Sequence, residues 1–308
     1  MKRVLLASTA LVMSAGIAAA EVSVGGDGRM GVVATNGGDV GFNSRVRITF
    51  TATGETDNGL TFGGTIRVDN GAATTNAIGA DGEPTQNPKG TALLNTGGGV
   101  NGAAGSVNVA GAFGTISMGD VSGAPEAAVG DANQRSLTGL GWHNELAYLS
   151  NSGKPAARWD YTMGDLTISA SADNPGPAGD QALGGSVAYS IGDVGFGLGI
   201  ERNGDDTHTA AGVSATLGDA SVKLVYGSKE DDDGSVGAGD DQYAASGTFV
   251  SGSATFTAFM ARNFAEQDHF GISASFDLGG SASIKGGFVD GDSLTGGASF
   301  DLGIAMGF

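Results

Sequence analysis

Apolar and polar residues alternate along most of this chain with a period of two. Between Phe42 and Thr51, apolar side chains at positions 42, 46, 48 and 50 alternate with polar ones at positions 43, 45, 47, 49 and 51. Similar segments recur to the terminal Phe308, and the last large apolar residues, Leu302, Ile304, Met306 and Phe308, all fall on even-numbered positions. A period of two places apolar side chains on one face of a strand and polar ones on the other. The pattern predicts strands with one apolar face and one wet face.

Short turns and longer loops separate these segments in alternation. Short turns at one end of the strands and longer loops at the other are typical of bacterial membrane barrels. About sixteen segments can be counted, which is within the range of such barrels, and a closed barrel of that size encloses an aqueous channel. We therefore predict an all-β fold, a transmembrane antiparallel β-barrel. The tight turns are expected at 164, 192, 218, 252 and 279, and the longer loops at 173–180, 203–207, 229–241, 263–268 and 290–293.

One segment, from Met118 to Gly141, does not alternate. It carries Asp120, Glu126 and Asp131 among small residues and has no apolar face to bury. A structureless segment of this length is uncommon in a compact soluble domain. Inside a hollow barrel it can fold into the lumen and narrow it, and this is the prediction. Residues 142–155 suggest a helical turn or a short strand, and residues 70–103 a long exposed loop.

Arginines recur on the polar faces of the first three expected strands. Arg29, Arg45, Arg47 and Arg67 all lie there by alternation. Like charges on adjacent strands repel one another unless water and opposing carboxylates compensate them. The set of four therefore indicates a charged lumen wall, although any one of them could be an ordinary solvated strand residue. Three further basic residues are interpreted as plain lumen lining: Arg158, Lys223 and Lys285.

The first twenty residues predict a signal peptide. Lys2 and Arg3 precede an apolar run over residues 4–17, and three alanines at 18–20 follow it as a cleavage site. The run is too short to cross a bilayer as a helix. The mature chain is therefore expected to begin at Glu21 and to form a single barrel domain over residues 21–308.

Composition narrows the class of protein further. Without the two basic residues of the leader, 13 basic residues face 33 acidic ones, which argues against a nucleic-acid partner because such binding needs basic patches. The absence of cysteine excludes disulfides in an exported chain. Large aliphatic residues are sparse and glycine is abundant, with 57 residues. This suits a closed ladder of backbone hydrogen bonds better than a dense core.

Catalysis finds little support in the sequence. His143, His208 and His269 lack the spacing of a metal site, and no Gly-rich run ends in Gly-Lys-Ser or Gly-Lys-Thr. No nucleophile–base pair is evident, so we expect neither an enzyme nor a cofactor. Residues 231–234 lack the alternating ligands of a calcium hand loop, although the acidic loops leave room for a loosely bound calcium ion.

Five motifs give the chain a family resemblance. They are Gly26-Asp27-Gly28-Arg29-Met30-Gly31, Ser44-Arg45-Val46-Arg47, Leu60-Thr61-Phe62-Gly63-Gly64, the run from Gly111 to Asp120, and the terminal Phe308. Together they resemble the general diffusion porins of the alphaproteobacterial branch, which are trimeric sixteen-stranded barrels of Gram-negative outer membranes.

The resemblance implies passive passage of small hydrophilic solutes and ions. It also implies that Asp120, Glu126 and Asp131, on a third loop inside the lumen, face Arg29, Arg45, Arg47 and Arg67 on the wall. It implies a homotrimer in outer-membrane lipid. The alternative is a secreted, acidic Gly/Asp-rich β-solenoid or adhesin. That fold would need a short internal repeat such as the calcium-binding nonapeptide, and the sequence has none.

Overall fold

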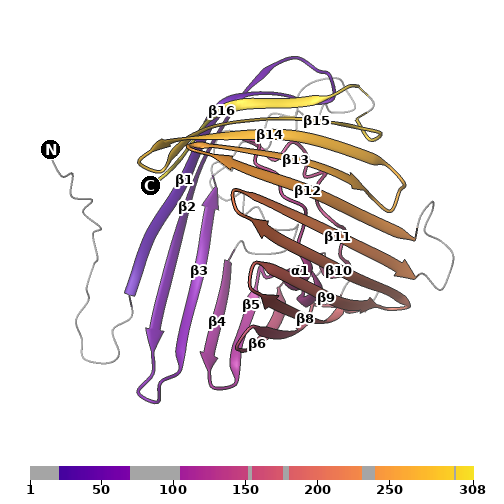
Figure 1. Cartoon of the computed structure of the whole chain (residues 1–308). Helices are drawn as coiled ribbons and strands as arrows, with labels where there is room; N and C mark the ends of the chain where they lie inside the picture. The colour runs from indigo at the N-terminus through magenta and orange to yellow at the C-terminus, as the bar shows by residue number, and fades with distance from the viewer. Residues whose placement is uncertain (1–20, 70–104, 152–154, 176–179, 231–239, 295) are drawn as a thin grey trace, which may run out of the picture.

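The computed structural model describes residues 21–69, 105–151, 155–175, 180–230, 240–294 and 296–308. Sixteen strands lie in these residues and form one closed barrel (Figure 1). Each strand pairs antiparallel with its neighbour in the chain, and the first pairs with the last. The predicted fold class and strand number are confirmed, and a solenoid is excluded. The strands are β1 (Glu21–Ala34), β2 (Gly41–Glu55), β3 (Thr61–Asp69), β4 (Gly105–Gly111), β5 (Gly114–Gly119), β6 (Ala156–Met163), β7 (Leu166–Ala172), β8 (Leu183–Ile191), β9 (Val194–Asn203), β10 (Asp206–Leu217), β11 (Ala220–Glu230), β12 (Asp241–Ser251), β13 (Ala254–Arg262), β14 (Asp268–Gly279), β15 (Ala282–Gly291) and β16 (Ser299–Gly307).

The barrel closes through the two ends of the chain. Strand β1 pairs with β16 from Asp27, opposite Gly307, to Ala34, opposite Phe300. Beyond the last strand residue, Phe308 exchanges two backbone hydrogen bonds with Gly26, of 2.7 and 3.0 Å. Closure leaves no unpaired sheet edge, which a strand in hydrocarbon cannot tolerate.

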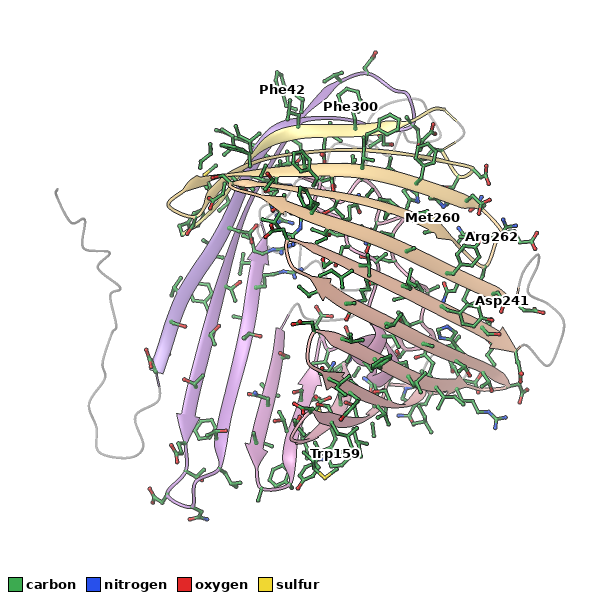
Figure 2. All side chains as sticks on the ribbon, viewed as in Figure 1. Phe42, Trp159, Asp241, Met260, Arg262 and Phe300 are labelled. Atoms are coloured by element: carbon green, nitrogen blue, oxygen red, sulfur yellow. The ribbon has the colours of Figure 1, made fainter. Side chains whose placement is uncertain are left out.

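The alternating pattern maps onto the two faces of the wall as predicted. Phe42 and Phe300 project outward from the barrel (Figure 2), whereas their chain neighbours Asn43 and Asp301 are buried on the inner side. An apolar outer face and a polar inner face are the arrangement that a barrel in lipid requires. The alternation therefore places the lipid outside and the polar lumen inside.

Glycine shapes the tight turns. Gly164, Gly192, Gly218 and Gly252 have φ between 55° and 63°, and each opens a two-residue turn between adjacent strands. A positive φ at this position is what a type II′ hairpin turn needs, and glycine adopts it without strain. The prediction of a longer loop at 203–207 is wrong. The ladder extends to the pair Asn203–Asp206, so only Gly204 and Asp205 connect β9 to β10.

Several predictions fall on residues outside the described ranges. These are the signal peptide at 1–20, the whole of the loop at 70–103, and residues 231–239 of the acidic loop at 229–241. In the described residues, no helix is long and apolar enough to cross a membrane. The same residues contain no group of three His, Asp or Glu side chains that could hold a metal ion.

Candidate functional site in the barrel lumen

The loop between β5 and β6 is longer than predicted. Strand β5 ends at Gly119 and β6 begins at Ala156, so residues 142–155 continue the loop that begins after Gly119. The loop contains a short helix, α1 (Ala124–Val129), and a 3-10 helix, η2 (Leu149–Asn151). It runs inside the barrel (Figure 1), because its partners are inward-facing side chains. We call its described residues, 120–151 and 155, the lumen loop.

Helix α1 lies against the wall where the wall has no side chains. Pro125 stands in its first turn, where a missing N–H costs nothing, and Gly130 ends it with φ 60°. The helix packs mainly on β8 and β9. A Cβ at Gly197 would lie 2.2 Å from the carbonyl oxygen of Ala128, and one at Gly199 would lie 2.6 Å from Cα of Pro125. The two glycines of β9 therefore allow the helix to dock closely.

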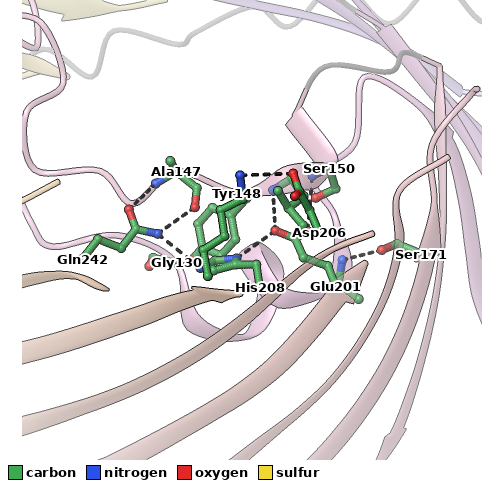
Figure 3. A network of polar contacts seen from close by, with 12 residues as sticks. Gly130, Ala147, Tyr148, Ser150, Ser171, Glu201, Asp206, His208 and Gln242 are labelled. Carbon is green, nitrogen blue, oxygen red and sulfur yellow. Dashed lines mark hydrogen bonds and ion pairs between the residues drawn. The ribbon is translucent and has the colours of Figure 1, made fainter. Parts of the chain in front are cut away.

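A buried polar network holds residues 147–150 of the lumen loop, which we call the returning limb because they lead back to β6 (Figure 3). The Glu201 carboxylate accepts the backbone N–H groups of Leu149 and Ser150, and lies 2.9 Å from Nδ1 of His208. Gln242 forms hydrogen bonds with both backbone groups of Ala147. Its Oε1 accepts the Ala147 N–H at 2.8 Å, and its Nε2 donates to the Ala147 carbonyl at 2.7 Å. The same Nε2 lies 3.2 Å from Nε2 of His208. Thus the amide orientation makes that imidazole nitrogen the acceptor and Nδ1 the donor to Glu201.

The middle of the loop crosses to the far strands of the barrel. The N–H of Asn133 donates to Ser246 Oγ on β12 at 2.8 Å, and that of Arg135 to Ser273 Oγ on β14 at 3.0 Å. On β16, the Asp301 carboxylate accepts the N–H groups of Leu137 and Thr138 at 3.1 and 2.6 Å, and the Thr138 hydroxyl at 2.7 Å. The loop is thus held across the lumen by inward-facing polar side chains of every second strand from β12 to β16.

The predicted wall arginines lie together on adjacent strands. Arg29 of β1 is directly opposite Arg45 of β2, and Asp27 is opposite Arg47. Like charges in opposite positions repel, and Asp27 offsets the repulsion by lying 2.7 Å from Arg45 and 3.9 Å from Arg47. On β3, Arg67 stands opposite Thr49, one strand further on.

The loop and the arginine wall meet around a cavity of about 460 Å³. Arg29 joins the two sides: its Nε donates to Asn43 at 3.0 Å and its Nη1 to the carbonyl of Leu137 at 3.1 Å. Of the four predicted arginines, Arg67 alone is not part of the cavity wall. The cavity is lined by Arg29, Arg45, Arg47, Lys285, Trp142 and the loop residues from Asn133 to Gly139.

The predicted acidic residues lie on other parts of the loop. Asp120 begins it, where its N–H bonds to Gly105 of β4 at 2.9 Å. Asp131 accepts the N–H of Leu146 at 2.9 Å and interacts electrostatically with Lys223 of β11. Burial raises the pKa of Asp131, while the Leu146 amide and Lys223 oppose that rise. Burial, followed by the negative charges of Asp131 and Glu126, raises the pKa of Glu145 to about 7.

Several residues of this site were not singled out by the sequence pattern. Glu201 and Asp301 directly follow outward-facing Ile200 and Phe300. Because adjacent strand residues lie on opposite faces, the alternation indicates that both carboxylates point into the barrel. No pattern in the sequence indicated that His143 of the loop stacks on His269 of β14, with ring centroids 4.4 Å apart. Lys285 was assigned to plain lumen lining, yet it borders the cavity.

The closed wall, the apolar exterior and the polar loop within define an outer-membrane β-barrel channel. The chain matches the Gram-negative porin family over residues 7–295, and it belongs to that family. It is similar to a porin of Rhodobacter capsulatus, with 31% identity over 94% of this chain and all of the relative. It is a passive diffusion channel rather than an enzyme, and porins in general need no cofactor.

Solved structures agree with this assignment. A porin structure refined at 1.8 Å is 28% identical, covers 94% of this chain and 100% of its own, and superposes with a TM-score of 0.74. A substituted porin of Rh. blastica shares the fold at 18% identity, with 93% of this chain and 100% of its own covered and a TM-score of 0.66.

Proposed function

We propose that small hydrophilic solutes and ions cross this porin through a constriction that the lumen loop forms with Arg29, Arg45, Arg47 and Arg67. The observation that carries the proposal is the hydrogen bond from Arg29 to Leu137, because it joins the arginine wall to the loop inside the lumen. A narrow passage lined by fixed charges selects solutes by size and by charge.

Acidic side chains are the proposed counterparts of the arginines. Glu126 stands on α1, which packs against β8 and β9, and these strands are far around the ring of sixteen from β1 and β2. In the lumen loop, Asp120 precedes α1 and Asp131 follows it. Opposed charges on two sides of a passage create a transverse field. Such a field orients dipolar solutes. It also holds water in the passage, and an apolar solute must displace that water at a cost in free energy.

Reversal potentials in planar lipid bilayers under a salt gradient test the proposal. Replacing Arg45 and Arg47 together with glutamine should shift permeability toward cations, because the passage loses two positive charges. The control is Arg202→Gln, which removes one charge from an exposed side chain at the β9–β10 turn. An unchanged reversal potential in the double variant would remove both arginines from the constriction.

We also propose that the channel is a homotrimer. Support comes from the family resemblance and from Phe42, which is 96% exposed on the outer face of β2. A side chain of this size on the exterior suits either lipid or a neighbouring barrel. Chemical cross-linking in mild detergent, read by native electrophoresis, should give a three-fold species. A species of monomer mass alone would contradict the trimer.

A further inference from the structure

The cavity between the lumen loop and the arginine wall has an unbalanced charge. Arg29, Arg45 and Arg47 approach it from β1 and β2, Lys285 from β15, and Arg135 from the loop. The carboxylate of Asp27 neutralises part of this charge through Arg45 and Arg47, and that of Asp301 interacts electrostatically with Arg29. No Asp or Glu lines the cavity in the residues that the structure describes. Five cations around one space give it a strongly positive potential.

Two polar groups beside the cavity have no hydrogen-bond partner in the part of the chain that the structure describes. The carboxamide of Gln134 is buried, and neither its oxygen nor its nitrogen has a hydrogen-bond partner in the described residues. Nε of Arg45 is also buried and also lacks a hydrogen-bond partner in the described residues. Buried donors of this kind are costly unless something satisfies them. Both belong to residues that line the cavity, so an acceptor entering it could take up their hydrogen bonds.

An aromatic surface lies beside these cations. Trp142 lines the cavity, and 55% of its surface is exposed. It ends four consecutive residues with positive φ, from Gly139 at 90° to Trp142 itself at 59°. A Cβ at Gly139 would lie 2.6–2.8 Å from three atoms of the indole, so the ring rests on a glycine backbone. An exposed indole held this way offers a flat surface for stacking.

We propose that this cavity binds aromatic phosphate esters, with the phosphate among the cations and the ring on Trp142. Arginine forks match phosphate oxygens in pairs, and a cavity of about 460 Å³ is within the range of small-molecule sites. The inference rests on the proposed function, since the solute must reach the lumen loop. It makes Arg135 and Trp142 specificity-determining residues, in addition to the wall arginines.

Tryptophan fluorescence tests the inference in the full-length protein in detergent. Trp142 and Trp159 are the two tryptophans of the chain, so Trp159→Phe leaves Trp142 as the reporter. Titration with 4-nitrophenyl phosphate should quench Trp142 with saturation. Inorganic phosphate supplies the charge without the ring, and 4-nitrobenzyl alcohol supplies the ring without the charge. Each should bind at least about tenfold more weakly, the factor that corresponds to one charge-assisted hydrogen bond or one stacking contact.

A matched pair of variants assigns the site. In the Trp159→Phe background, Arg135→Gln should raise the dissociation constant about tenfold, whereas Arg202→Gln should leave it unchanged. Calorimetric titration of Trp142→Leu, which has no reporter, should show a similar loss. Quenching that stays linear, or equal affinities in the two arginine variants, would overturn the inference.

Bilayer recordings of the same proteins separate this inference from the proposed function. A protein that conducts with the expected selectivity but binds no ester would refute only the subsite. A protein in which the arginine substitutions leave selectivity unchanged would refute the constriction itself.

Discussion

The carboxylate of Glu201 on β9 lies 2.9 Å from the imidazole of His208 on β10, and both side chains are almost completely buried inside the barrel. The same carboxylate holds two backbone amides of the lumen loop. Two adjacent strands and the returning limb therefore share one anchor. The fold stabilises the loop through wall side chains rather than through the loop's own secondary structure.

Loss of this anchor should free the returning limb. Glu201→Ala leaves two loop amides and the imidazole donor buried without an acceptor, which should cost about 3 kcal/mol of unfolding free energy. Denaturant titration in detergent measures that loss, and limited proteolysis should show faster cleavage near Leu149. Glu201→Gln is the control of similar shape, with a smaller loss. Equal stability and equal cleavage in Glu201→Ala would show that the network does not hold the loop.

A second anchor lies at Asp301. Asp301→Ala removes the acceptor of two backbone amides and of the Thr138 hydroxyl, at a cost of about 1–3 kcal/mol. The middle of the loop should then move away from the wall more often. Single-channel recordings should show larger current fluctuations and a higher mean conductance. Asp193→Asn removes the same charge at an exposed turn and should conduct as the native protein does. Identical traces from both variants would contradict the anchoring role.

Ion selectivity should change with pH near neutrality because of Glu145. Its pKa is raised to about 7, so the side chain is neutral at pH 5.5 and negatively charged at pH 8. Reversal potentials should shift toward cations as the pH rises through that range. Glu145→Gln should flatten this part of the profile, while Glu55→Gln, at the exposed end of β2, should not. The raised pKa also means that the neutral carboxyl stabilises the fold below pH 4.5, the ordinary value, and that this contribution is lost as the pH rises through 7.

The stacked histidines make one corner of the loop sensitive to acid. Burial, and then the neighbouring His269, lowers the pKa of His143. A lowered pKa favours the neutral ring in the folded protein. The stability that this provides is complete above the ordinary value of 6.5 and is lost as the pH falls through the lower folded-state pKa. In the Trp159→Phe background, the emission of neighbouring Trp142 should therefore change on acidification.

The control for this effect keeps the ring and removes the proton. The phenyl ring of His143→Phe can stack on His269 without titrating. The emission of Trp142 in this variant should therefore vary less between pH 7 and pH 5. The profile should be recorded with Glu145→Gln present, because that carboxyl titrates close by. A profile that His143→Phe leaves unaltered would assign the change to another group.

Part of the site could be predicted from the sequence because it depends only on whether a strand residue has an odd or an even position. Arg29, Arg45 and Arg47 were assigned to one inner wall, since alternate residues of a strand share a face and consecutive strands are neighbours. The path of the lumen loop could not be predicted. Several of its contacts pair residues more than a hundred positions apart, such as Asn133 with Ser246, and no local pattern encodes such a distance. Phe259 makes the same point: it is apolar like the exposed Phe256 of the same strand, yet it is buried on the inner side.

The sequence by itself determined the barrel, its strand number and the side of the wall on which most side chains lie, because a two-residue period and glycine turns are local properties. Only the tertiary structure decided which wall residues the loop meets. It placed Arg135 and Trp142 beside the arginines, and Glu126 and Asp131 on the limb that packs near β8–β11. The physical reason is that the loop has no regular apolar period that would assign its residues to one face, although Val129, Leu140 and Leu146 are buried in a cluster with wall residues, contrary to the expectation that the segment has no apolar face to bury. Its position depends on this cluster and on buried hydrogen bonds to Glu201, Gln242 and Asp301, which come together only when the barrel closes.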